Sequence, residues 1–134
     1  MSVIPRAVEA KRRRLLFIED HTELLATYER VFRHHEIVLV ETGEEGLETL
    51  KRQRDFFDLV ICDLVLPGID GIEVFKRARA ADPEMVSRFV FATGSNTRQE
   101  FQAELEMIDV PILEKPFGIR MLREMLERAG NSKR

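Results

Sequence analysis

Five short apolar runs divide this chain, and they restrict its fold more than any other feature. The runs are continuous rather than alternating in polarity, and they occupy residues 15–18, 37–40, 59–62, 89–92 and 110–113. A continuous apolar run of this length is typical of a strand that is buried on both faces of a sheet. The pattern therefore predicts five strands, with each stretch between them available for a helix.

The stretches that follow the runs carry apolar residues three or four positions apart, which predicts helices. These helices are expected at about 24–32, 44–54, 72–81, 101–108 and 119–126. Asp20 or Thr22 is a candidate cap for the first helix, and Asp82-Pro83 is expected to end the third. Five strand–helix pairs predict an α/β fold, in which a five-stranded parallel sheet carries helices on both faces.

Length and composition fit one domain that needs neither a disulfide nor a structural metal. The chain has 134 residues, of which 44% are hydrophobic and 34% charged, and its formal net charge of −3 gives no indication of nucleic-acid binding. The lone cysteine, Cys62, excludes a disulfide framework or a zinc site and fits a reducing cytoplasm. No apolar run approaches the ~18 residues that cross a bilayer. We therefore expect a cytoplasmic protein with no membrane partner and no direct nucleic-acid partner.

The ends of the chain differ in character from its middle. Residues 1–12 have mixed polarity and lead into the basic run Lys11–Arg14, so we expect a tail or linker there. We expect the domain itself over 13–129 and a C-terminal tail over 130–134. The last predicted helix uses up the chain, so no second domain is expected.

Polar residues gather where the predicted strands end. Glu19 and Asp20 follow the first strand, Asp63 the third, Thr93 the fourth and Lys115 the fifth. In open α/β sheets, ligands bind beyond the carboxyl ends of the strands. If the strands are parallel, all of these groups converge at one edge of the sheet.

The chemistry of this set points to a phosphoryl group beside a metal ion. Three close carboxylates repel one another unless a cation lies among them. Mg²⁺ is suited to that place, because it prefers one or two carboxylates together with waters and phosphate oxygens. Lys115 adds a compact positive charge and Thr93 a hydroxyl donor.

The motifs Glu19-Asp20, Asp63 to Gly71, Thr93-Gly94 and Lys115-Pro116-Phe117 resemble those of the receiver domain of two-component response regulators. The resemblance covers about residues 13–129 and implies a flavodoxin-like, doubly wound (βα)5 fold. It extends to stand-alone response regulators and to the receivers of hybrid histidine kinases, and the sequence does not distinguish between these two settings.

The resemblance implies a role for each motif residue. Asp63 would be the phosphoryl acceptor. Asp20, Asp63 and the main-chain carbonyl of Val65 would bind Mg²⁺ directly, and Glu19 would act through water. Lys115 would bind a phosphoryl oxygen.

The segment after the fourth strand would respond to the phosphoryl group. Thr93 would swing in to form a hydrogen bond with it, and Gly94 would leave room for the donor. Ile112 departs from the family pattern, which often has Tyr, Phe or His at that position as a switch. Phosphoryl chemistry is expected to survive this change, whereas the usual aromatic route for passing on the signal is in doubt.

The implied partners are a histidine kinase or a histidine phosphotransfer protein, a downstream protein target and, as an option, a second copy in a weak homodimer. The chain would catalyse only its own phosphorylation and dephosphorylation. Two alternatives remain open. A phosphorylation-independent binding module is one, for which Ile112 gives some support. An aspartyl-phosphate phosphatase of the haloacid-dehalogenase type is the other, although Val65 stands where that family has a second aspartate.

Overall fold

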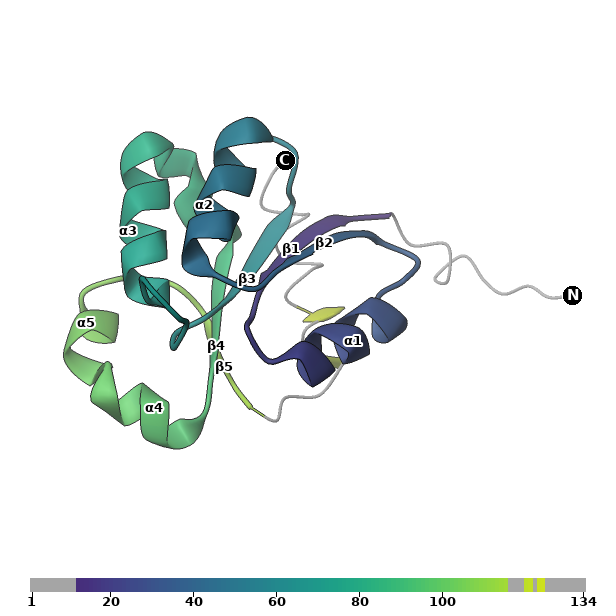
Figure 1. The fold of residues 1–134 in the computed structure, drawn as a ribbon. Coiled ribbons are helices and arrows are strands. Elements are labelled where there is room, and N and C mark those ends of the chain that lie inside the picture. Colours follow the sequence, from purple (N-terminus) through teal and green to yellow (C-terminus); the bar gives the residue numbers. More distant parts are fainter. Residues whose placement is uncertain (1–11, 116–119, 122, 125–134) are drawn as a thin grey trace, which may run out of the picture.

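A parallel sheet forms the centre of the molecule (Figure 1). The computed structural model describes residues 12–115, 120–121 and 123–124. The strands are β1 (Arg14–Ile18), β2 (Glu36–Val40), β3 (Leu59–Asp63), β4 (Phe89–Thr93) and β5 (Ile112–Glu114). Their order is β2-β1-β3-β4-β5, and every pair is parallel. In this doubly wound order the chain reverses its direction across the sheet at β1 and β3, which is where such folds form their ligand crevice.

Helices cover both faces of the sheet, as predicted. They are α1 (Thr22–Val31), α2 (Gly43–Arg52), α3 (Gly71–Ala81), the 3₁₀ helix η2 (Pro83–Arg88), α4 (Ser95–Glu100) and α5 (Gln102–Glu106). Successive β1 side chains point to opposite faces: Leu15 and Phe17 pack with residues of α1, whereas Leu16 and Ile18 pack with residues of α2, α3 and α5. The expected α/β architecture is confirmed.

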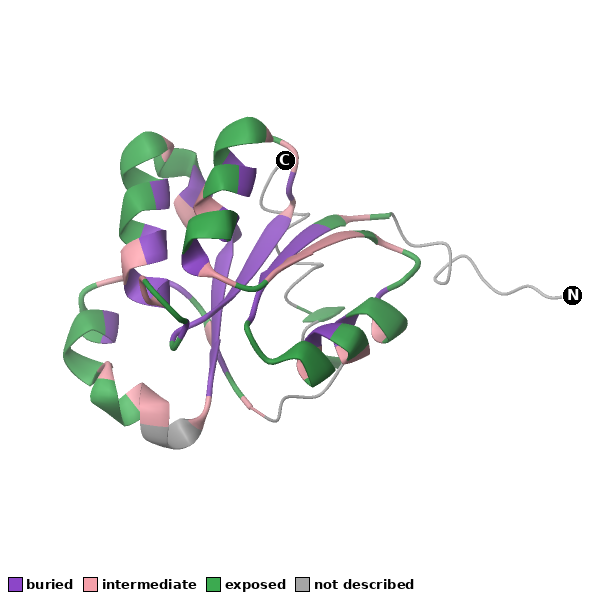
Figure 2. Cartoon of the chain, in the orientation of Figure 1, coloured by how far each residue is buried: buried purple, intermediate pink, exposed green. Residues whose placement is uncertain are grey.

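The middle strands are buried on both faces, which explains their continuous apolar runs. Every residue of β3 and β4 is buried, whereas the edge strand β2 is only half-buried (Figure 2). Aromatic rings fill both layers. Phe17 stacks on Tyr28 with their ring centroids 4.2 Å apart, and Phe75 meets Phe89 edge to face at 5.3 Å.

Two predicted elements differ from the structure. The fifth strand begins at Ile112 and includes Glu114, whereas we predicted 110–113. Pro111 has no N–H to donate, although its carbonyl already accepts a hydrogen bond from the Phe91 N–H at 2.9 Å. Of the helix predicted over 101–108, only Gln102–Glu106 forms α5. The short helix α4 precedes it, was not predicted, and ends where the chain leaves it at Phe101.

The prediction for the last helix falls mainly on residues outside the described part of the chain, including Ile119, Leu122, Met125 and Leu126. The described residues of this segment, 120–121 and 123–124, are helical. The tails predicted over 1–12 and 130–134 also lie outside the description, except for Arg12. Within the described residues, no helix is both long enough and apolar enough to cross a membrane.

Helix starts place polar residues near the carboxyl edge of the sheet. The predicted capping of α1 by Asp20 or Thr22 was wrong, because His21 occupies the cap position and no side chain caps it. The Asp20 carboxylate therefore does not cap α1 and remains available for other contacts. In contrast, Asp70 caps α3 by accepting a hydrogen bond from the Glu73 N–H at 2.9 Å.

Candidate functional site

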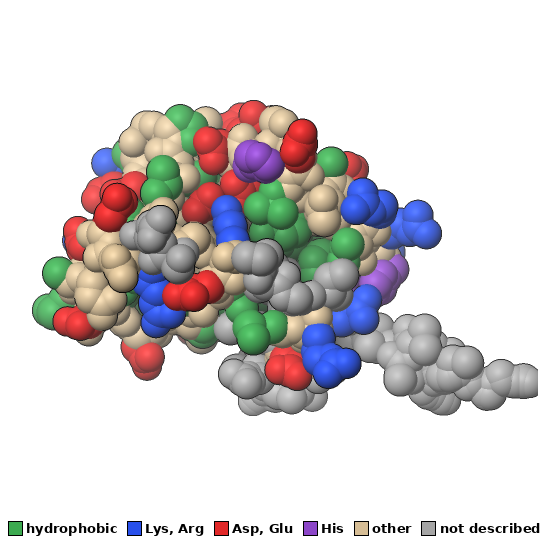
Figure 3. Space-filling model, turned by 90° about the horizontal axis from the view of Figure 1, so that it is seen from below, with side chains coloured by type: hydrophobic (Ala, Val, Ile, Leu, Met, Phe, Trp, Pro, Cys, Tyr) green, Lys and Arg blue, Asp and Glu red, His purple; other side chains and the backbone are tan. Residues whose placement is uncertain are grey.

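A cleft of about 600 Å³ opens at the carboxyl edge of the sheet, where β1 and β3 lie side by side. Its lining includes residues at or just beyond the carboxyl ends of four strands, namely Glu19 and Asp20, Asp63, Gly94 and Lys115. Figure 3 views the molecule from below and shows acidic side chains gathered around a basic one. The cleft thus lies at the crevice that the strand order creates.

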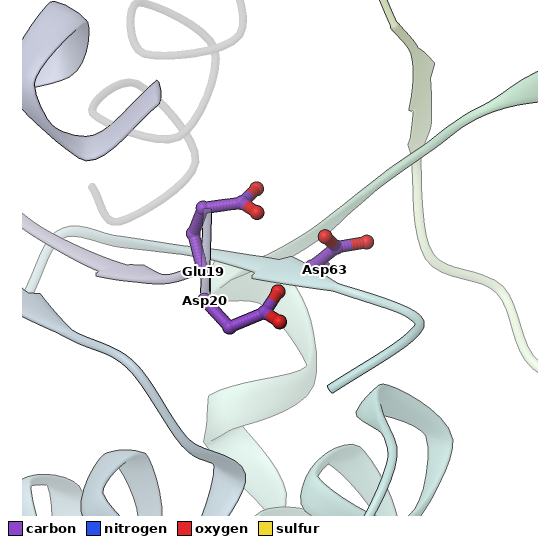
Figure 4. Close-up of side chains that lie close together, drawn as sticks. All are labelled: Glu19, Asp20 and Asp63. Atoms are coloured by element: carbon purple, nitrogen blue, oxygen red, sulfur yellow. The ribbon is translucent and has the colours of Figure 1, made fainter. Parts of the chain in front are cut away.

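Three carboxylates meet in this cleft. Ile18 at the end of β1 pairs with Cys62, so the residues that follow them, Glu19-Asp20 and Asp63, emerge beside one another. The carboxyl groups of Glu19 and Asp20 project to the side on which Asp63 lies (Figure 4), and one oxygen of each of the three acids lies within 4.8 Å of the others. Glu19 is 3% exposed and Asp63 8%, whereas Asp20 is open to solvent.

Lys115 bridges two of these acids. Its ammonium donates to Glu19 Oε1 and to Asp63 Oδ2, both at 2.9 Å. The β4–β5 pairing fixes this position, because the Lys115 N–H donates to the Thr93 carbonyl at 2.7 Å, directly beyond the last strand pair. A single lysine therefore acts as counter-ion to two buried carboxylates.

Burial and charge shift the pKa values of both Glu19 and Lys115. Burial raises the pKa of Glu19, and the negative charge of Asp63 adds to the rise, while the Lys115 hydrogen bond opposes it. Burial alone would lower the pKa of Lys115, but its hydrogen bonds to Glu19 and Asp63 outweigh that effect and raise the pKa above its usual value. Lys115 is thus a permanent cation at neutral pH.

The carboxylate oxygens of the three acids that Lys115 and His21 do not contact are available as hard ligands for a metal ion. Lys115 occupies Glu19 Oε1 and Asp63 Oδ2, and the His21 N–H donates to Glu19 Oε2 at 3.2 Å. Among the described residues, nothing donates a hydrogen bond to the Asp20 carboxylate. When all three acids are ionised, the one ammonium leaves two negative charges uncompensated. Oxygen donors with this charge fit a divalent cation.

Thr93 lies at the end of β4 but does not join the carboxylates. Its side chain is fully buried, and its hydroxyl donates to the carbonyl of Gly94 at 3.3 Å. Gly94 itself faces open space, because a Cβ built there would have no atom within 4 Å. Val65 is 51% exposed at the rim, and its N–H donates a long hydrogen bond of 3.4 Å to Asp63 Oδ1.

Two further residues shape the site through contacts that the sequence alone does not show. Gly71 begins α3 against the backbone of Asp63, and a Cβ there would overlap the Asp63 carbonyl oxygen and lie 2.9 Å from Leu64 Cα. Thr97 of α4 also lines the cleft. Gly71 ends the Asp63 to Gly71 motif, whereas Thr97 carries no signal in the sequence. The structural effect of each depends on the approach of a second element.

Comparison with known proteins agrees with this fold and cleft. The family model of the response regulator receiver domain matches residues 15–127. The response regulator receiver protein CpdR of Brucella abortus is 29% identical over 120 residues, which are 87% of this chain and 95% of CpdR. The crystal structure of a response regulator receiver protein from Sinorhizobium medicae superposes with a TM-score of 0.76 at 27% identity, covering 92% of this chain and 98% of that one.

A longer relative matches over a shorter stretch. The transcriptional regulatory protein AfsQ1 of Streptomyces coelicolor is 40% identical over 70 residues, which are 51% of this chain but only 30% of AfsQ1. The chain therefore spans less than a third of this regulator and nearly all of CpdR. Since the family match runs through almost the whole chain, the protein belongs to the response regulator receiver domains of two-component signal transduction.

Proposed function

We propose that Asp63 accepts a phosphoryl group from a phosphohistidine of a histidine kinase or a histidine phosphotransfer protein. The observation that carries the proposal is the pairing of Asp63 Oδ2 with the Lys115 ammonium at 2.9 Å, inside a cleft that holds two further acids. A carboxylate with a fixed cation beside it can act as a nucleophile while the cation faces the incoming phosphoryl oxygens.

The donor set supports Mg²⁺ as the cofactor. Asp20 and Asp63 would hold the ion directly, together with the main-chain carbonyl of Val65. Glu19 would act through water, as the resemblance to the family implies. When bound, Mg²⁺ would supply positive charge that offsets the acids and the oxygens of the phosphoryl group.

The transfer itself needs little from the protein beyond position and charge. An Asp63 carboxylate oxygen attacks the phosphorus atom and forms the new P–O bond. The P–N bond to the donor imidazole breaks, and its electron pair stays on the imidazole nitrogen. Lys115 binds a phosphoryl oxygen throughout, and the open space at Gly94 admits the donor. Water later hydrolyses the aspartyl phosphate.

The response would begin at Thr93. Its hydroxyl would leave the Gly94 carbonyl and donate a hydrogen bond to a phosphoryl oxygen instead. The phosphoryl group as a whole carries roughly −1.5 to −2 charge. That new contact would shift the population of the β4–α4–β5 face, where the Arg98 guanidinium now contacts Glu114 at 3.1 Å. A downstream protein target would read this face. Ile112, which is half-buried beside it, would pack there in place of an aromatic switch.

We place this chain in the cytoplasm, as a signalling domain that catalyses only its own phosphorylation and dephosphorylation. The phosphorylation-independent binding module and the phosphatase are the alternatives that an experiment has to separate from it. The three hypotheses differ in what they predict with a small phosphodonor. A phospho-accepting receiver gains one phosphoryl group, a binding module gains none, and a phosphatase hydrolyses the donor continuously.

The test is the intact mass of the protein after incubation with a small acyl phosphate and Mg²⁺. We expect a gain of one phosphoryl group by the unmodified chain and none by Asp63→Asn. Asp55→Asn, which removes an exposed acid from the turn after α2, is the matched control and should gain the group normally. No gain by the unmodified chain would favour the binding module, and sustained hydrolysis of the donor would favour the phosphatase.

A further inference from the structure

A second groove lies between α2 and α3, near the carboxyl ends of the two helices and therefore at the end away from the acidic cleft. The two helices run side by side on the same face of the sheet (Figure 1). The groove has a volume of about 420 Å³, which is within the range of small-ligand and side-chain pockets. None of its lining residues belongs to the acidic cleft.

The floor of the groove is apolar and part of the core. Leu50 of α2, Ala78 of α3 and Met85 of η2 form it, and each is at most 5% exposed. Leu47 and Ala81 extend the apolar surface up the two walls. The apolar residues that α3 contributes, Ala78 and Ala81, are both alanines, so no large apolar side chain from this helix fills the space.

A hydrogen bond joins the two walls. Arg54, in the turn after α2, donates from Nη2 to the carbonyl of Ala81 at the end of α3, at 3.0 Å. The groove is thus spanned by a contact between residues 27 positions apart in the sequence.

The rim of the groove is cationic. Lys51, Arg54 and Arg77 stand around it with a single acid, Asp82. Arg77 is compensated, because its Nε lies 2.8 Å from Glu73 Oε2. Among the ion pairs formed by the described residues, none includes Lys51 or Arg54. Arg54 spends one of its five N–H groups on Ala81, so most of its donors are available.

We propose that this groove binds an acidic segment of a partner protein, which places an apolar side chain on the Leu50–Ala78–Met85 floor and carboxylates on Lys51 and Arg54. Charge complementarity identifies the occupant: an apolar hollow between uncompensated cations matches a segment that alternates apolar and acidic residues.

The two ends of this chain do not match the acidic segment that the groove would bind. Residues 1–11 carry Arg6 and Lys11 against Glu9, and residues 125–134 carry Arg128, Lys133 and Arg134 against Glu127.

This inference is independent of the phosphoryl chemistry. The groove and the cleft share no residue, so a partner could remain bound while the cleft exchanges phosphoryl groups. The groove would then serve to hold the receiver beside a partner, whatever the state of Asp63.

The test selects short peptides from a random display library on the full-length chain and measures their binding by fluorescence anisotropy. We expect the selected peptides to be rich in Asp or Glu next to Leu, Ile or Phe. Their affinity should fall about tenfold in Lys51→Glu, which reverses a rim charge. Ala81→Phe, which fills the hollow from an exposed position, should abolish binding.

Lys76→Glu is the matched control, because it makes the same change of charge on the exposed face of α3 outside the groove, and it should bind as the unmodified chain does. Thermal unfolding establishes that each variant is folded. Selection of basic peptides, binding that survives both groove variants, or an equal loss in Lys51→Glu and Lys76→Glu would each overturn the proposal.

Discussion

The Lys115 ammonium lies 2.9 Å from Asp63 Oδ2, although the two residues are 52 positions apart in the sequence. The β3–β4 and β4–β5 pairings create this contact, because they bring the ends of β3 and β5 to the same edge of the sheet on either side of Thr93. The same ammonium holds Glu19, so it neutralises part of the cleft before any phosphoryl group arrives. This arrangement leads to the first prediction.

Replacing Lys115 with glutamine should slow phosphoryl gain far more than it changes the fold. The amide keeps much of the side chain's length but supplies no positive charge to the transferring oxygens, so we expect a rate loss of about 10²-fold. The rate is measured by intact mass against time with a small acyl phosphate and saturating Mg²⁺. Lys76→Gln, an exposed lysine on α3, should leave the rate unchanged. Equal rates for all three proteins would remove Lys115 from the mechanism.

Magnesium should stabilise the fold through Asp20. Binding to the folded state alone adds about 2.7 kcal/mol at a ligand concentration of a hundred times Kd, which is measurable as a rise in the denaturation midpoint. Asp20→Asn removes a carboxylate that accepts no hydrogen bond from a described residue and is free to bind the ion. The rise in the denaturation midpoint should therefore largely disappear. The control is Glu23→Gln, because Glu23 lines the same cleft but is not part of the acid cluster. A full rise in Asp20→Asn would contradict the assignment of that ligand.

Gly71, which lies against the backbone of Asp63, and Gly94, which lines the cleft, should tolerate alanine very differently. A Cβ at Gly71 would overlap the Asp63 carbonyl oxygen, so α3 would have to move away from β3. We expect Gly71→Ala to lower the free energy of unfolding by about 1–3 kcal/mol. At Gly94 the same atom would meet nothing within 4 Å, so Gly94→Ala should unfold like the unmodified chain. Urea titrations of the two variants make the comparison, and similar losses in both would contradict the close approach of α3.

His35 should make stability depend on pH. Burial, followed by the positive charges of His34, Arg13, Arg123 and Arg12, lowers the pKa of His35 from 6.5 to about 4. The unfolded chain therefore takes up a proton on His35 near pH 6.5, whereas the folded chain does so only near pH 4. The stabilising contribution is present above pH 6.5 and is lost as the pH falls towards 4.

His35→Asn keeps an acceptor for the Arg13 N–H, which now lies 3.0 Å from His35 Nδ1, but it removes the titrating ring. Urea unfolding of this variant should therefore depend less on pH between 4 and 6.5 than unfolding of the unmodified chain does. An NMR titration of the folded protein gives the His35 midpoint directly. A midpoint near the ordinary value of 6.5 would contradict the packing described for this ring.

Much of the fold and of the acid cluster could be predicted, because both depend on local patterns. The buried strands appear in the sequence as apolar runs. Asp63 was identified because it directly follows one run, and Lys115 because it lies two residues beyond another. Parallel pairing then brings their side chains to one edge without further information. The family motifs pointed to the same residues.

Other features depend on the approach of elements that are distant in sequence, so no local pattern predicts them. The hydroxyl of Thr93 donates to its own neighbour's carbonyl rather than to the carboxylates, which only coordinates reveal. The need for glycine at position 71 follows from how closely α3 meets β3. The break at Phe101 between α4 and α5 and the late start of β5 at Ile112 are boundaries, which sequence patterns place poorly.

The most direct measurement traps the phosphoryl group where it is formed. Borohydride reduces an aspartyl phosphate to homoserine, so peptide mapping of the reduced, phosphorylated chain identifies the acceptor residue. The account predicts homoserine at position 63, dependent on Mg²⁺ and on the phosphodonor. Homoserine at Asp20 or at another acid, or none in a chain that has gained phosphate, would contradict it.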